Sequence, residues 1–347
     1  MEPSANDQND LVDWRRAAAI AGRLAMPGPT AERGQLESLV DELRDAAGRA
    51  AVHVAEIAQL EAADGTDPKD VSNVLVVDRA RWAQANAQMF GVMTGDVEVP
   101  SGRGARAAGA AQVGGVLALL STKVLGQFDP FTPQGRHVGR LLLVAPNVLH
   151  HERKLKVDAS DFRLWVALHE QTHAMQFAAA PWLAEHVRSR AAELLNDLTG
   201  EGARPDLVGS VTRALGDDGG GILDALSPRQ RTVFEEVGAV MSLLEGHADV
   251  TMDEVGPSVV PTVRRIRTAF DARRDQASKG KGLDQVLRRV LGLDAKLAQY
   301  RDGAKFVREV RRSVGTTGFN AVFASAQNLP LPPEIADPRA WVRRVHG

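Results

Sequence analysis

The chain has 347 residues, of which 44% are hydrophobic and 25% are charged, and it contains no cysteine. This composition is typical of a globular protein with a sizeable core and argues against intrinsic disorder. The lack of cysteine excludes disulfides and thiolate metal sites and fits a reducing compartment. The formal net charge of -2 gives no general attraction to nucleic acid or to an anionic membrane, so we expect neither as a partner.

Helical patterns dominate the first third of the chain. The segment 73–82, NVLVVDRARW, predicts a short strand that leads into a helix. Residues 107–120, AAGAAQVGGVLALL, are apolar but short for a bilayer span, and their small side chains favour a packed core helix. The polar N-terminus lacks the basic and then apolar pattern of a secretory signal, so we expect a cytoplasmic protein.

The middle of the chain carries the clearest strand, GRLLLVAPNVL at residues 139–149. Pro146 near its end predicts a strand end or a sheet edge. A helix is expected to follow from Asp158, a good capping residue, and Pro181 can begin the next helix. Residues 199–221 have the most loop-like composition of the chain.

A long helix is expected from Ser227, with more amphipathic helices over 258–314 and an extended, proline-rich tail, LPLPPEIADPRAW. We therefore predict a mainly α protein with a small β-sheet, of the α+β class. An N-terminal helical region with a short strand would cover residues 1–135, and the region with the chemistry would cover 136–347. The two regions could equally form one continuous domain.

The stretch WVALHEQTHAMQF places His169 and His173 four residues apart, with Glu170 directly after the first. On a helix, residues four apart share a face, so both imidazoles can reach one zinc ion. Glu170 is one step round the helix, where it can act as a general base on a water without binding the metal. The competing interpretation is a helix whose histidines are satisfied by hydrogen bonds within the core.

A hydrolytic zinc site needs a third protein ligand and an open fourth position. A third histidine ligand on the same helix would stand at position 179, three residues after a glycine at position 176. This chain has Gln176 and Ala179 at these positions. The remaining option is a glutamate ligand followed four residues later by an aspartate, which could orient a ligand histidine from outside the coordination sphere.

Two pairs of residues have this spacing, Glu193 with Asp197 and Glu245 with Asp249. Gly246, next to Glu245, would let another backbone approach closely. A charged residue on an otherwise apolar helix needs a partner, and a metal ion is a good one. The spacing alone leaves both pairs open.

Three segments, DFRLWVALHEQTHAMQF, LLEGHADVTMDEV and KLAQYRDGAKFV, together resemble the zincin-like family of actinobacterial and related proteins described as hydrolases by inference. The opening VDW and the segment VLVVDR are most similar to the subgroup associated with biosynthesis of the deazaflavin coenzyme. The likeness extends over nearly the whole chain.

The resemblance implies a zincin-like metallopeptidase core with extra helices. It also implies that His169 and His173 are zinc ligands, that Glu170 is the base and that Glu245 is the third ligand. The link from His173 to Glu245 is much longer than in classical zincins whose third ligand is a glutamate, which keeps Glu193 as the alternative.

An active site of this kind needs a second donor for the developing oxyanion. Tyr300, the only tyrosine, and His247 are the candidates, although each could equally serve packing or lie at a surface. Asn147, near the end of the predicted strand, is a further candidate for holding the substrate backbone.

We therefore predict a zinc-dependent, metallopeptidase-like hydrolase that acts on peptide or related amide bonds of a peptide or protein substrate. The alternative is a catalytically inactive zincin-fold protein with a binding or regulatory role and a structural zinc. A structural zinc would have its fourth position closed, for example by His247 or Asp249.

Overall fold

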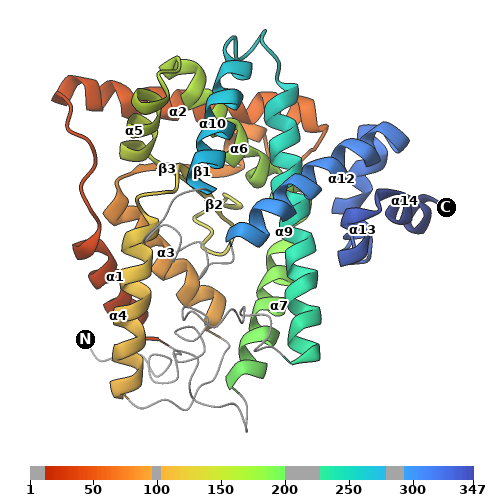
Figure 1. Cartoon of the computed structure of the whole chain (residues 1–347), viewed down its shortest axis with the longest axis horizontal. Coiled ribbons are helices and arrows are strands. Elements are labelled where there is room, and N and C mark those ends of the chain that lie inside the picture. The colour runs from red at the N-terminus through yellow and green to blue at the C-terminus, as the bar shows by residue number, and fades with distance from the viewer. Residues whose placement is uncertain (1–11, 96–102, 200–226, 279–292) are drawn as a thin grey trace. The chain divides into compact units, whose positions relative to one another are not determined.

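The computed structural model describes residues 12–95, 103–199, 227–278 and 293–347. Helices make up most of this part, together with one small sheet (Figure 1), which confirms the predicted α+β class. Among the described residues, no helix combines the length and apolar character needed to cross a bilayer. The α-helices described are α1 (Trp14–Leu24), α2 (Arg33–Ala58), α3 (Arg79–Thr94), α4 (Arg103–Leu120), α5 (Ala145–Leu155), α6 (Ala159–Ala179), α7 (Trp182–Thr199), α9 (Pro228–Glu254), α10 (Val263–Ser278), α12 (Leu293–Asn320), α13 (Pro332–Ala336) and α14 (Pro338–His346).

The chain divides into two compact units, one of residues 1–188 with 254–263 and one of residues 189–253 with 264–347. The first unit contains the sheet and α6, and the second contains most of α9. The boundary expected between residues 135 and 136 stays a prediction. The loop-like segment 199–221 lies, apart from its first residue, outside the described residues.

The sheet of the first unit has three strands in the order β1 (Ser72–Val77), β3 (Gly139–Val144) and β2 (Gly126–Asp129). β1 runs parallel to β3, and β2 runs antiparallel to it. β3 is therefore the central strand, and it is buried along its whole length. The strand ends before Pro146, which confirms the expected strand end, whereas the alternative of a sheet edge is wrong. Residues 145–149, expected as part of the strand, begin α5. Pro146 lies in the first turn of α5, where its missing N–H leaves no hydrogen bond unmade.

Helix α4 confirms the expected core helix at residues 107–120. It packs against α1 and α3, and small residues allow the close approach. A methyl group on Gly114 would lie 2.9 Å from the carbonyl oxygen of Ala17 in α1. These helices bury Trp82 and Leu117 against Leu142 of the central strand. They form the layer on one side of the sheet.

Helix α6 is buried on nearly all sides rather than along one stripe. It begins at Asp158, whose carboxylate accepts a hydrogen bond from the backbone N–H of Asp161, as predicted. It packs against α2 and also contacts β2 and β3. Gln171 in its middle donates to the carbonyl of Ala47 in α2 and accepts from the hydroxyl of Ser72 in β1. The helix is thereby held between α2 and the sheet.

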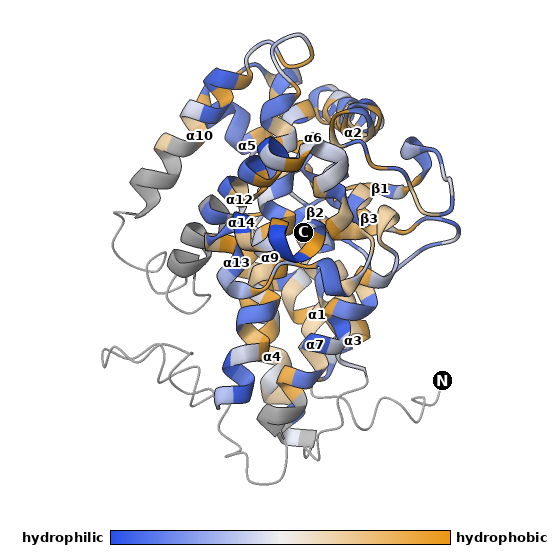
Figure 2. Cartoon of the chain, turned by 90° about the vertical axis from the view of Figure 1, so that its right-hand side faces the viewer, coloured by the Kyte–Doolittle hydropathy of each residue, from blue (hydrophilic) through white to orange (hydrophobic). Residues whose placement is uncertain are grey.

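In the second unit, α9 and α12 cross at two glycines. A methyl group on Gly246 would collide with the backbone of Gly303, so the close crossing depends on the missing side chains. Most of the tail is not extended as predicted, because Pro332 and Pro338 occupy the first turns of α13 and α14. α14 carries hydrophobic and hydrophilic residues on opposite sides (Figure 2), and it buries Trp341.

Candidate metal centre

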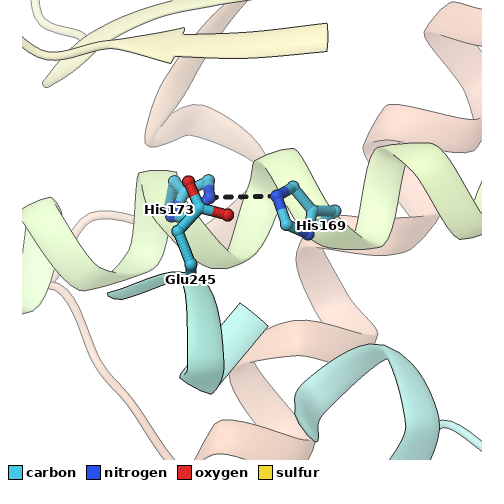
Figure 3. Close-up of side chains that lie close together, drawn as sticks. All are labelled: His169, His173 and Glu245. Atoms are coloured by element: carbon cyan, nitrogen blue, oxygen red, sulfur yellow. Dashed lines mark hydrogen bonds between the residues drawn. The ribbon is translucent and has the colours of Figure 1, made fainter. Parts of the chain in front are cut away.

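His169 and His173 lie on adjacent turns of α6, and their side chains converge as predicted from their spacing. The two Nε2 atoms are 3.2 Å apart, and the ring planes are nearly perpendicular, at 87°. Figure 3 shows the rings directed at each other across the helix surface. Both side chains are half-buried, so the pair is shielded yet accessible.

This separation fits a shared divalent cation. Two ligands at ~2.0–2.1 Å from a tetrahedral zinc ion are roughly 3.3–3.4 Å apart. The Nε2 atoms already lie close to this spacing. The same separation is that of a hydrogen bond between the two rings, drawn as a dashed line in Figure 3, so a metal ion would replace this bond. The donor set therefore fits zinc without rearrangement of the helix.

The orientation of His173 is set by Gln176, three residues further along α6. Nδ1 of His173 donates a hydrogen bond of 2.9 Å to the amide oxygen Oε1 of Gln176, which is fully buried. Because Nδ1 carries the proton, Nε2 keeps its lone pair and can bind a metal. This role of Gln176 was not predicted from the sequence, where position 176 was interpreted as the place of a missing glycine. The spacing of three residues on a helix was the signal available.

Glu170 is buried, with 6% of its surface exposed, and it packs against the edge strand β2. A methyl group on Gly126 at the start of β2 would lie 2.6 Å from Cγ and 2.8 Å from Oε1 of Glu170. Only a glycine therefore leaves room for this carboxylate at its present place.

The position of β2 depends on a buried ion pair. Nη2 of Arg140 in β3 donates to Oδ2 of Asp129 in β2 at 2.7 Å, and both side chains are almost fully buried. The other oxygen of Asp129 accepts from the backbone N–H groups of Phe131 and Thr132. Asp129 thus fixes both the register of β2 and the turn that follows it. Gly126 is held against Glu170 by the same strand.

His169, His173 and Glu245 form a group of potential ligands, shown together in Figure 3. Each offers one ligand atom, and these atoms lie within 4.8 Å of one another. The histidines come from α6 and the glutamate from α9, so the ligands are far apart in the sequence. Two imidazoles and one carboxylate are a ligand set typical of catalytic zinc.

The chain matches the model of a family described as zincin-like metallopeptidases over residues 12–342. It belongs to this family. A solved structure of a protein from Chloroflexus aurantiacus, described as a proposed hydrolase with a novel fold, is also similar. It is 29% identical, with a TM-score of 0.65, and the alignment covers 96% of this chain and 98% of that chain. No curated protein matches. Zincin-like proteins typically bind zinc, in agreement with the donor set.

The alternative ligand of this zincin-like protein, Glu193, is engaged elsewhere. Its carboxylate pairs with Arg229 at 2.9 Å and with Arg190 at 2.9 Å. The hydrogen bond from Arg229 is the main reason why the pKa of Glu193 lies below its usual value. The side chain of Asp197 lies outside the described residues. These contacts favour Glu245 over Glu193.

The remaining site candidates occupy distinct surroundings. Asp249 pairs with Arg267 at 3.3 Å, so its expected role in orienting a ligand histidine stays a prediction. His247 is fully buried against the rings of Phe319 and Phe323, which favours a packing role. Tyr300 belongs to α12, but its side chain lies outside the described residues.

Asn147 serves the fold. Its side-chain amide donates to the carbonyls of Ser121 at 2.7 Å and Val124 at 2.6 Å. Its Oδ1 accepts from Nε of Arg79 at 2.7 Å. The side chain fastens the end of α4 and the following turn to α5, and its full burial argues against a role in holding a substrate.

Proposed function

We propose that this zincin-like protein is a zinc-dependent hydrolase that cleaves peptide or related amide bonds of a peptide or protein substrate. The observation that carries the proposal is the convergence of the two Nε2 atoms at 3.2 Å, with a carboxylate of Glu245 in the same group. In this proposal His169, His173 and Glu245 bind the metal. When bound, zinc would polarise a scissile carbonyl and lower the pKa of a water molecule.

Glu170 is proposed as the general base. It would accept the proton of the attacking water and deliver it to the leaving nitrogen. Its burial beside Gly126 supports this role, because a carboxylate held in one place needs no reorganisation during the reaction. Of the two predicted donors to the oxyanion, Tyr300 is the one proposed here, because His247 is fully buried against Phe319 and Phe323. Asp249 is proposed to orient the ligands from outside. The narrower relation to actinobacterial proteins of deazaflavin coenzyme biosynthesis stays a prediction.

The direct test is turnover by the zinc-loaded protein of a quenched fluorescent peptide library, with cleavage sites read by mass spectrometry. Glu170→Gln should retain zinc and lose turnover by about 10²–10⁴-fold. Removal of zinc with a chelator should abolish turnover, and zinc should restore it. Bound zinc without any turnover that depends on Glu170 would contradict the proposal and support the alternative, an inactive binding or regulatory protein with a structural zinc.

A further inference from the structure

A pocket of about 440 Å³ opens in the first unit, beside the C-terminal end of α6. This volume lies within the range of ligand pockets, roughly 300–1,000 Å³. Its lining is mainly apolar and includes Pro130, Val138, Phe177 and Ala184. Asp64 is the charged residue of the lining. The pocket therefore has room for a long apolar group, and Asp64 contributes one carboxylate to its lining.

Two elements connect this pocket to the candidate metal centre. Phe177 follows His173 on α6 by four residues, which is about 6 Å along the helix. The ring of Phe177 packs against that of Phe128 in β2, with centroids 5.8 Å apart. Phe128 is two residues from Gly126, which contacts Glu170. α6 and β2 thus both extend from the proposed catalytic residues to the pocket wall.

Asp64 is held in a defined place. Its Oδ1 accepts a hydrogen bond of 3.0 Å from the backbone N–H of Thr66. This backbone bond is the main reason why the pKa of Asp64 lies below its usual value, so the group is ionised at neutral pH. A fixed anion at the rim of an apolar pocket attracts a group with a cationic end and repels an anionic one.

We propose that this pocket is a substrate subsite for a long side chain with an apolar stem and a cationic end, as in lysine. Phe177 lies one helical turn beyond His173, so we expect this side chain to belong to a residue near the hydrolysed bond. The subsite rests on the proposed hydrolase function and names its preferred substrate. The apolar stem would pack against Phe177 and Pro130, and the ammonium group would lie near Asp64.

The test uses binding, so that it does not depend on turnover. Glu170→Gln protein loaded with zinc is titrated with fluorescein-labelled peptides that carry lysine, norleucine, glutamate or glycine at one varied position. Fluorescence anisotropy gives the dissociation constants. In this background, Asp64→Asn should reduce the preference for lysine over norleucine about two- to fivefold, the size expected for an exposed charge. Ala184→Phe should weaken the lysine and norleucine peptides about tenfold and leave the glycine peptide unchanged.

Asp67→Asn is the matched control, because Asp67 is an exposed acid that also accepts from a backbone N–H, that of Lys69, and is not part of the lining. An equal reduction of the preference for lysine over norleucine in Asp64→Asn and Asp67→Asn would overturn the subsite. A lysine preference that neither variant changes would overturn it as well. Wild-type cleavage without any lysine preference would overturn the subsite and support the hydrolase. Lysine binding that depends on Asp64, without cleavage by the wild type, would support the pocket and overturn the hydrolase.

Discussion

Nδ1 of His173 donates a hydrogen bond of 2.9 Å to Oε1 of Gln176 within the same helix. This bond fixes the tautomer of the imidazole and directs the lone pair of its Nε2 towards His169. A partner of this kind raises the basicity of a ligand histidine and restrains its ring. Gln176 is therefore the positioning residue of the candidate metal centre.

Replacement of Gln176 by leucine should weaken zinc binding about 10–100-fold, because Nδ1 of His173 loses its acceptor. Competition with a chromophoric chelator measures the affinity. Gln176→Glu, which keeps an acceptor oxygen at nearly the same place, should retain most of it. Equal losses in both variants, or a loss in neither, would show that the hydrogen bond does not set the metal affinity.

Gly126→Ala should reduce turnover about 10–100-fold and leave zinc affinity unchanged, because the three atoms nearest to the new methyl group all belong to Glu170, whose side chain it displaces. Gly48→Ala is the control, since Gly48 has no neighbour within 4 Å of the added methyl group. Steady-state kinetics and zinc titration check the two quantities separately. Unchanged kcat in Gly126→Ala would mean that Glu170 does not act from its present position.

Glu245→Gln should lose zinc on dialysis, whereas Glu193→Gln should keep it, because Glu193 is held by Arg229 and Arg190. The two changes remove the same charge from the same residue type, so each controls the other. Metal content by atomic emission after dialysis is the measurement. Loss of zinc only in Glu193→Gln would show that Glu193, and not Glu245, is the third ligand.

Asp129→Ala should destabilise the protein by about 3–5 kcal/mol, because it leaves the buried guanidinium of Arg140 without its partner. Urea unfolding measures the change. The double variant Asp129→Leu with Arg140→Met removes both charges and should lose less stability than Asp129→Ala. A double variant as unstable as Asp129→Ala would show that packing of β2, rather than the unpaired charge, explains the loss.

The stability contribution of Glu334 should disappear at low pH. Burial raises the pKa of its carboxyl group, but the hydrogen bond from Arg344 and the backbone N–H of Leu331 outweigh burial, and the pKa lies below its usual value. A depressed pKa gives stability that is present at neutral pH and lost as the pH falls through the folded-state pKa. Glu334→Gln should therefore be less stable than the wild type in urea at pH 7, and the gap should close towards pH 3.

The sequence was most informative where the chain follows simple periodic rules. The spacing of His169 and His173 predicted their convergence, because an α-helix fixes which residues share a face. The valine-rich run at residues 74–77 predicted β1, and the small residues of 107–120 predicted α4. In each case a local pattern and its tertiary environment require the same structure.

Other features depend on contacts that no local pattern specifies. β2 has four residues, Gly126 to Asp129, with no apolar alternation, and it is a strand because it pairs with β3 and bonds through Asp129. β3 ends at Val144, just before Pro146, as one of the two expectations had it, but Pro332 and Pro338 occupy first helical turns where an extended tail was expected. Which of Glu193 and Glu245 lies with the two histidines is likewise not specified by the spacing in the sequence.

The central claim is that Nε2 of His169 and Nε2 of His173 bind one zinc ion together with Glu245. Anomalous X-ray diffraction at the zinc absorption edge, from crystals of the zinc-loaded protein, tests it most directly. One anomalous peak is expected at about 2.0–2.2 Å from both Nε2 atoms and from a carboxylate oxygen of Glu245. Crystals that contain zinc but show no peak there, with the two rings hydrogen-bonded to each other, would contradict it.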